Sequence, residues 1–132
     1  MSTPFDPTIL TRRTTENMED KEYFLVVSDG DDDLAVAGDL GICIGAMTND
    51  VADGSSTAIY VPVQIGGIIK VKVGAACTSG NLCSSDGNGE AKDYTPDTGG
   101  GTDAFAFGIA LGTYADGDVG AFLWSPTYYI SA

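Results

Sequence analysis

Glycine is the residue that most restricts the fold of this chain, because 18 of the 132 residues are glycine. The glycines are spread among short runs rich in Val, Ile, Thr, Tyr and Phe, which favour extended strands. This arrangement is typical of many short strands joined by tight turns, and no stretch shows a sustained apolar period of about 3.6 residues. The sequence therefore predicts an all-β fold, either a small β-barrel or a β-sandwich, with little helix.

The individual strands are predicted from apolar runs and the turn residues between them. Residues 58–65 and 68–73 would form a hairpin across Gly66 and Gly67. Pro62 predicts an edge strand or a bulge, because proline has no backbone N–H to donate. Residues 74–101 are predicted to be polar and rich in turns, and residues 127–130 either add a strand or dock on a neighbour. The other predicted strands are residues 22–28, 34–36, 41–45, 104–113 and 119–124, the last two joined by an acidic hairpin at residues 115–118.

The charge of the chain is strongly negative, with 19 acidic residues, 6 basic residues and a net charge of −13. From Glu22 onward the basic residues are Lys70, Lys72 and Lys92. A body of this sign repels nucleic acid phosphates and anionic lipid, so neither nucleic acid nor a membrane is expected as a partner. The sequence also lacks an apolar run of the ~18 residues that a membrane span needs, and its start does not resemble a secretory signal.

Residues 1–21 are predicted to be an extended N-terminal arm, followed by a β-rich domain over residues 22–132. The arm contains Pro4 and Pro7 and no sustained period, so it cannot bury its own apolar side chains. It also holds both arginines of the chain, which would pair with carboxylates on a partner. We expect it to bind an external surface, and the alternative is a frayed terminus. The predicted binding residues are Phe5, Ile9, Leu10, Arg12 and Arg13.

The residues available for catalysis are few. The chain contains no histidine, which excludes Ser-His-Asp and Cys-His catalysis and imidazole-based zinc sites. The glycine motifs of phosphate-binding loops and dinucleotide-binding folds are absent from the sequence as well. A pair of carboxylates could hydrolyse glycosides, but the acidic residues are predicted at surface turns, which do not suit a general acid. We expect no catalytic residue and no enzyme activity.

Cysteines and acidic turns are the candidate metal ligands. Cys43 lies in an apolar run and is predicted to be a small buried residue. Cys77 and Cys83 are predicted to be free thiols, with a short disulfide as the alternative, and they do not form the Cys-x-x-Cys pair of a usual zinc set. Residues 29–33 and 86–90 offer oxygen ligands that suit calcium, but turn formation explains them more simply. We therefore expect no metal and no cofactor.

The second half of the chain carries an ordered series of motifs. An apolar/lysine alternation at residues 68–73 is followed by a corner of small residues and by a turn at residues 86–89. A late strand, residues 107–111, precedes the acidic hairpin and the last strand. Over about residues 58–124, this order resembles the head-decoration (cement) proteins of tailed bacteriophages.

The resemblance implies a β-rich decoration domain, commonly a homotrimer, on the outer capsid surface of a virion assembled in the host cytoplasm. Such a protein would bind the major capsid protein and stabilise the shell against the pressure of packaged DNA, and its N-terminal arm would extend over the shell. The aromatic residues near the C-terminus exceed what a small monomer need expose. We therefore predict contacts between copies at Phe122, Trp124, Tyr128 and Tyr129.

Two other functions remain open on the sequence alone. One is a virion-surface or secreted β-domain that recognises a host glycan through Trp124, Tyr128 and Tyr129. The number of copies per particle would separate it from a decoration protein. The other is a soluble calcium-binding β-domain, which would lose thermal stability in a chelator.

Overall fold

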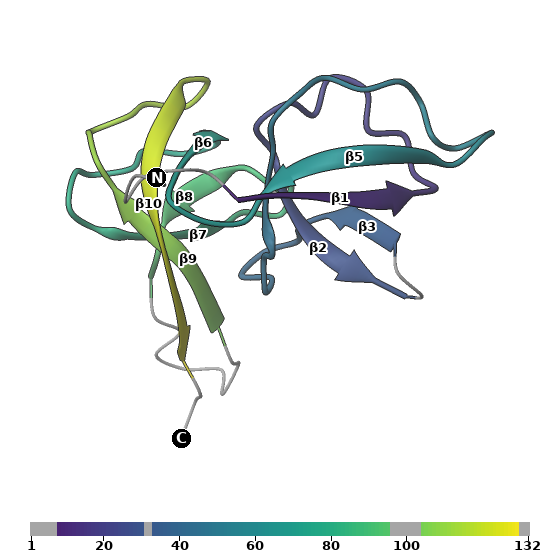
Figure 1. Cartoon of the computed structure of the whole chain (residues 1–132). Coiled ribbons are helices and arrows are strands. Elements are labelled where there is room, and N and C mark those ends of the chain that lie inside the picture. The colour runs from purple at the N-terminus through teal and green to yellow at the C-terminus, as the bar shows by residue number, and fades with distance from the viewer. Residues whose placement is uncertain (1–7, 31–32, 96–103, 130–132) are drawn as a thin grey trace, which may run out of the picture.

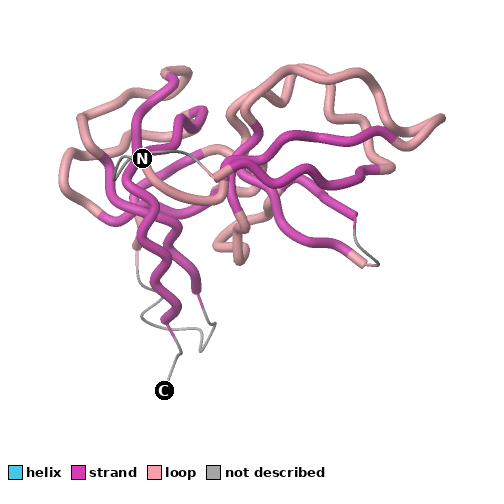
Figure 2. Tube along the Cα trace, in the orientation of Figure 1, coloured by secondary structure: helices cyan, strands magenta, loops and turns pink. Residues whose placement is uncertain are grey.

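A computed structural model of the chain describes residues 8–30, 33–95 and 104–129, and within these residues it is all-β, as predicted (Figure 1). Figure 2 shows strands joined by loops throughout this part of the chain. No helix in the described residues is long and apolar enough to cross a membrane. The strands are β1 (Ile9–Thr14), β2 (Leu25–Asp29), β3 (Asp33–Val36), β4 (Gly45–Met47), β5 (Ile59–Gln64), β6 (Ile68–Lys72), β7 (Leu82–Ser85), β8 (Ala91–Asp93), β9 (Ala104–Ala110) and β10 (Val119–Tyr129).

The first five strands form a closed barrel in the order β1-β3-β2-β4-β5. β1 closes the barrel, because it pairs antiparallel with β5 over its whole length and parallel with β3 on its other side. The buried hydroxyl of Thr14 strengthens the β1–β3 contact by donating a hydrogen bond to the carbonyl oxygen of Leu34, at 3.0 Å. The buried apolar residues of the barrel are Met18, Val26, Leu34, Met47, Val61 and Val63.

The prediction of an extended arm is therefore wrong for the part of residues 1–21 that the structure describes. Ile9–Thr14 is a barrel strand, and Met18 is fully buried. The physical reason is that β1 supplies backbone partners to both β3 and β5, which would otherwise present open edges. A strand in this position needs few apolar residues of its own. Phe5 lies outside the described residues.

The last five strands form a second sheet in the order β6-β10-β9-β7-β8. A parallel bridge between Val73, just after β6, and Ala91 of β8 connects the two edges of this sheet. Beside this bridge, the amide of Gly74 donates to the carbonyl oxygen of Ala91 at 2.9 Å. The second sheet is thus curled almost into a barrel of its own, and the far end of the β9–β10 pair extends beyond it (Figure 1).

The predicted hairpin across Gly66 and Gly67 is wrong, although both of its strands are present. β5 belongs to the barrel, whereas β6 pairs with β10 in the second sheet. The two glycines instead carry the chain from one sheet to the other, with Gly67 at a φ of 75°. β1 and β4 already occupy the two sides of β5, so a local turn signal does not decide its partner.

The prediction that Pro62 marks an edge strand or a bulge is wrong, because β5 has a strand on each side and pairs with β1 in continuous register. The carbonyl oxygen of Pro62 accepts a hydrogen bond from the amide of Thr48, at 3.3 Å, just beyond the end of β4. The nitrogen and carbonyl of one strand residue point to the same side, so the proline nitrogen faces the place where the β4 ladder ends. The missing N–H therefore costs one possible hydrogen bond at the end of this ladder and none within it.

A shared core joins the barrel to the second sheet. Backbone hydrogen bonds cross the junction from Leu25 to Gly89 (2.8 Å), from Leu40 to Ser85 (2.9 Å) and from Lys72 to Tyr23 (2.9 Å). An ion pair between Lys92 and Asp39 spans it at the surface. The buried core residues are Leu25, Ala37, Cys43, Ala46, Ile69, Val71, Val73, Cys77, Cys83, Ala91, Phe105, Phe107, Ala110 and Phe122.

Candidate functional site

The predicted capsid-binding residues are divided between the two faces of β1. Ile9 and Arg13 lie on the outer face, and Tyr60 of β5 lies directly opposite Arg13. Ile9 is 48% exposed and Tyr60 is 69% exposed. We call Ile9, Arg13 and Tyr60 the β1–β5 face. Ile9 and Arg13 are the members of the predicted set that lie on the outside of the barrel, and Tyr60 joins them from β5 without having been predicted.

Leu10 and Arg12 lie on the other face of β1, opposite the fully buried Val63 and Val61. Strand alternation separates them from Ile9 and Arg13 because successive side chains point to opposite faces. An extended arm implies no strand alternation over residues 9–14, which is why these side chains were expected on one binding surface. The predicted residues therefore do not form one continuous binding surface.

Arg13 already has an acidic partner within the chain. Its Nε atom donates to Oδ1 of Asp33 at 2.7 Å, on the neighbouring strand β3. This hydrogen bond holds the pKa of Asp33 below its ordinary value. The parallel pairing of β1 and β3 thus gives Arg13 a partner within the chain, and its predicted contact with a capsid carboxylate stays a prediction.

The aromatic residues predicted as contacts between copies are largely part of the core. Phe122 is fully buried, and its ring meets that of Phe107 edge-on at 5.2 Å. Trp124 is half-buried and stacks on Phe107 at 6.4 Å. The prediction for Phe122 is wrong, because this residue faces inward on a central strand between β6 and β9. Tyr128 is 48% exposed, and the side chain of Tyr129 lies outside the described residues.

The exposed apolar surface of the second sheet lies one residue away from Phe122. Leu123 of β10 is directly opposite Ile68 of β6 on one side and Ile109 of β9 on the other, and Leu82 of β7 is opposite Ile109. Directly opposite residues share a face of a sheet, so these side chains form a row across it. Ile68 and Leu123 are each 38% exposed. We call Ile68, Leu123, Ile109 and Leu82 the aliphatic row.

The strands that carry the aliphatic row contain none of the 19 acidic residues of the chain. β6 adds Lys70, which is exposed and lies two residues after Ile68, on the same face. Like charges that approach one another cost free energy. A second acidic protein can therefore approach this row with little repulsion from the strands themselves, as it can the β1–β5 face, whose strands also lack acidic residues.

A small pocket lies between the barrel and the second sheet. Its volume is about 180 Å³, and its lining includes Tyr23, Met47, Gln64 and Lys70. Sites for small-molecule ligands usually measure ~300–1,000 Å³. The pocket is thus too small for a typical organic substrate.

The turn predicted at residues 86–89 is present and joins β7 to β8 within the segment expected to be turn-rich. Oδ1 of Asp86 accepts hydrogen bonds from the amides of Asn88, at 2.8 Å, and Glu90, at 3.0 Å. Burial raises the pKa of Glu90, and the carboxylate of Asp86 adds to this shift. The carboxylate of Asp86 therefore stabilises the turn, which agrees with the prediction that this segment is a turn.

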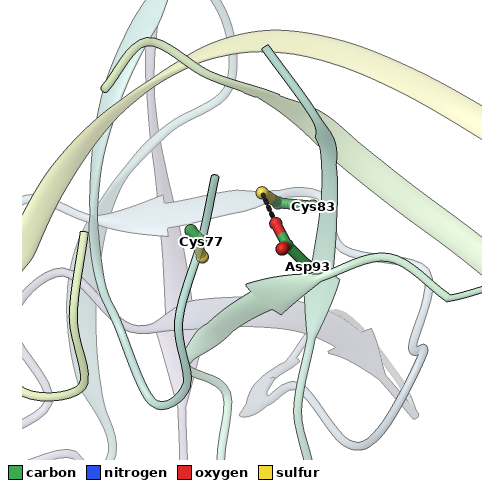
Figure 3. Close-up of side chains that lie close together, drawn as sticks. All are labelled: Cys77, Cys83 and Asp93. Atoms are coloured by element: carbon green, nitrogen blue, oxygen red, sulfur yellow. Dashed lines mark hydrogen bonds between the residues drawn. The ribbon is translucent and has the colours of Figure 1, made fainter. Parts of the chain in front are cut away.

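A cluster that the sequence analysis missed brings together Cys77, Cys83 and Asp93 (Figure 3). Their ligand atoms all lie within 4.8 Å of one another. Cys83 on β7 is directly opposite Asp93 on β8, whereas Cys77 precedes β7 and is bridged to Tyr114. The turn at residues 86–89, treated as the centre of a hairpin, would have placed Cys83 near Asp93.

The three cysteines of the chain are free thiols in this structure, and all are buried, as predicted for Cys43. Hydrogen bonding from Cys83 lowers the pKa of Cys77, whereas the same contact and burial raise the pKa of Cys83. Asp93 is held by Thr78, whose amide donates to Oδ1 at 3.0 Å and whose hydroxyl donates to Oδ2 at 3.2 Å. The cluster therefore combines two buried sulfur atoms with an oriented carboxylate.

The sequence matches no protein-family model and no curated protein. The fold is similar to that in the crystal structure of the head fiber gp8.5 N base of bacteriophage phi29, with a TM-score of 0.69. The match covers 91% of this chain and 95% of the phage chain, at 20% sequence identity. The two proteins therefore share their fold over nearly their whole lengths.

Proposed function

We propose that this chain is a non-catalytic structural protein of a phage head, and that it binds the outer surface of the capsid as a decoration protein. The observation that carries the proposal is the match to the phi29 head fiber base, because it covers nearly all of both chains. The phi29 protein is part of a phage head, and we propose the same location for this chain. The order of motifs over residues 58–124 supports the same setting independently.

The chemistry of the chain supports a binding role over a catalytic one. A chain without histidine, with a pocket of about 180 Å³, offers little for the conversion of an organic substrate. Capsid shells present the same surface many times, so weak repeated contacts give strong attachment without a deep pocket. A β-domain with small exposed apolar groups fits this mode of binding.

In this proposal each of the two expected partners binds one of the two exposed surfaces described above. We assign the β1–β5 face, together with the residues that precede it, to the major capsid protein. We assign the aliphatic row to contacts between copies in a homotrimer, because it gathers aliphatic side chains from neighbouring strands that carry no acidic residue. Burial of Leu123 and Ile68 between copies would stabilise the assembly by about 25 cal/mol per Å² of apolar surface.

The glycan-binding alternative has less support. It relied on Trp124, Tyr128 and Tyr129, but Trp124 stacks on Phe107 and packs against the core. A sugar platform needs an aromatic ring whose face is open, and among the described side chains of this set only Tyr128 is exposed.

Binding to capsids that lack this chain tests the proposal. The full-length protein would be mixed with capsids of the same virus and sedimented, and saturation at a fixed ratio to the major capsid protein is expected. Tyr60→Ala and Ile9→Ala should weaken binding, whereas Ile42→Ala, at a residue that is 56% exposed outside both surfaces, should not. If the unaltered chain stays in the supernatant at every concentration, the decoration function is wrong.

A further inference from the structure

We propose that Cys77, Cys83 and Asp93 form a binding site for a borderline-soft divalent cation, with Zn²⁺ as the ion that fits best. The ligand atoms come from separate segments and lie within 4.8 Å of one another. The three residues are not recognisable as a site from their spacing in the sequence, because the pairing of β7 with β8 is what brings Asp93 beside the cysteines. The proposal does not depend on the function proposed above.

The donor atoms select the class of cation. Thiolates favour Zn²⁺ and other soft or borderline metals, whereas Ca²⁺ and Mg²⁺ prefer ligand sets made only of oxygen. Zn²⁺ binds thiolate sulfur at ~2.3 Å and carboxylate oxygen at ~2.0–2.2 Å, so its tetrahedral ligands lie less than about 4 Å apart. The Cys77, Cys83 and Asp93 ligand atoms need to close only slightly from their present separation to meet this geometry.

The surroundings of the cluster hold the carboxylate ligand in place. Thr78 donates from its amide to Oδ1 of Asp93 and from its hydroxyl to Oδ2. Ligands of bound metals are commonly oriented by such a second layer of hydrogen bonds. Thr78 also follows Cys77 directly, so the segment that supplies one thiol fixes the carboxylate as well.

The position of the cluster provides both burial and access. Cys77 and Cys83 are fully buried and belong to the core shared by the barrel and the second sheet. Asp93 is half-buried, so the cluster reaches solvent on its side, where a water molecule can complete the coordination. A cation here would link the segment before β7 to both β7 and β8. It would therefore stabilise the folded chain by mass action.

Cation binding to the reduced full-length chain tests this site. Zn²⁺ would be titrated in competition with a chromophoric chelator, and Co²⁺ would be used to record thiolate-to-metal charge transfer and tetrahedral d–d bands. We expect one ion per chain and a higher melting temperature with Zn²⁺ than with chelator. Cys43→Ala is the matched control, because this buried cysteine lies outside the cluster, and it should bind as the unaltered chain does.

Variants of the cluster separate its ligands from ordinary core residues. Cys77→Ser and Cys83→Ser should each weaken the charge-transfer band, and the double variant should abolish it. Asp93→Asn should weaken Zn²⁺ binding by at least tenfold while it keeps the fold, which guards against loss of folding in the buried cysteine variants. The proposal is overturned if the reduced chain gives no cobalt–thiolate band, or if the band survives in the variant that lacks both Cys77 and Cys83. It is also overturned if Asp93→Asn binds Zn²⁺ as tightly as the unaltered chain.

Discussion

The amide of Leu25 in the barrel donates a hydrogen bond of 2.8 Å to the carbonyl oxygen of Gly89, in the turn between β7 and β8 of the second sheet. Gly89 has a φ of 79°, in the left-handed region that favours glycine. A Cβ atom at this position would collide with Cγ1 of Val36 in the barrel. The two halves of the molecule are therefore joined at a point where only glycine fits.

Replacement of Gly89 by alanine should destabilise the protein strongly. The left-handed backbone costs about 1–3 kcal/mol for a residue other than glycine, and the collision with Val36 adds the ~1–3 kcal/mol of an overpacked core. Gly87→Ala is the matched control in the same turn, because a Cβ there meets nothing within 4 Å. Urea unfolding should show a large loss for Gly89→Ala and almost none for Gly87→Ala. Equal losses would show that the collision is relieved at little cost.

The same change to alanine should cost far more stability at Phe122 than at its neighbour Leu123. Phe122→Ala removes a fully buried ring and should lower the free energy of unfolding by about 3–5 kcal/mol. Leu123→Ala alters an exposed position and should cost about 1 kcal/mol or less. Unfolding at low protein concentration, where copies are separate, measures both. A small effect at Phe122 would contradict its assignment to the core.

Leu123→Lys should weaken association between copies. The substitution places a charge in the middle of the aliphatic row, and a buried unpaired charge is costly. Light scattering at micromolar concentration should give a mass near three chains for the unaltered protein and a lower mass for the variant. Ile42→Lys is the control, because Ile42 is also exposed but lies outside the row. A trimer that tolerates Leu123→Lys would place the interface elsewhere.

The Arg13–Asp33 pair should contribute to the dependence of stability on pH. The hydrogen bond from Arg13 lowers the pKa of Asp33 below its ordinary value of 3.8. The unfolded chain therefore takes up this proton first as the pH falls. The contribution is present above the unfolded pKa and is lost as the pH falls through the folded one.

Arg13→Gln should raise the pKa of Asp33 toward its ordinary value, as measured by NMR titration of the carboxyl carbon. It should also reduce the loss of stability at acidic pH. Arg12→Gln is the control, since Arg12 makes the smallest contribution to the shift. An unchanged Asp33 titration in Arg13→Gln would show that the pair does not persist in solution.

Truncations of the N-terminus should separate folding from capsid binding. Removal of residues 2–7 keeps β1 and should leave the melting temperature unchanged. Because it removes Phe5, capsid affinity should fall roughly tenfold, which corresponds to about 1.4 kcal/mol. Removal of residues 2–20 deletes β1 and Met18 and should abolish cooperative unfolding. A folded product of the longer truncation would show that the barrel closes without β1.

The strand content could be predicted from the sequence because glycines and β-branched residues are local signals. The last hairpin is present, since β9 and β10 pair antiparallel, although β10 runs on to Tyr129. Residues 127–129 belong to this strand, which agrees with one of the two predicted alternatives for the tail, that it adds a strand. The partner of β5 could not be predicted, because Gly66 and Gly67 suit a linker between sheets as well as a hairpin turn.

The candidate sites depend on which strands pair with one another, and the residues within a strand do not reveal its partner. Phe122 and Leu123 are neighbours on β10, but only the register with β6 and β9 shows which of them faces the core. Cys83 and Asp93 likewise meet through the β7–β8 register, across a segment that looked only polar and turn-rich. The sequence alone therefore does not show which face of a strand points to the core when the pairing partners of that strand are unknown.

The pairing of β1 with β5 also has a consequence for the order in which the protein folds. As the chain is synthesised, β1 cannot complete its hydrogen bonds until Ile59–Gln64 has left the ribosome. The entropy cost of closing so long a loop comes before the β1–β5 contacts that offset it. β-Proteins dominated by pairings between distant strands fold in ~milliseconds to seconds. Until then β1 presents unpaired backbone groups, and Arg12 and Arg13 on this strand add the charge that discourages such edges from pairing with other nascent chains.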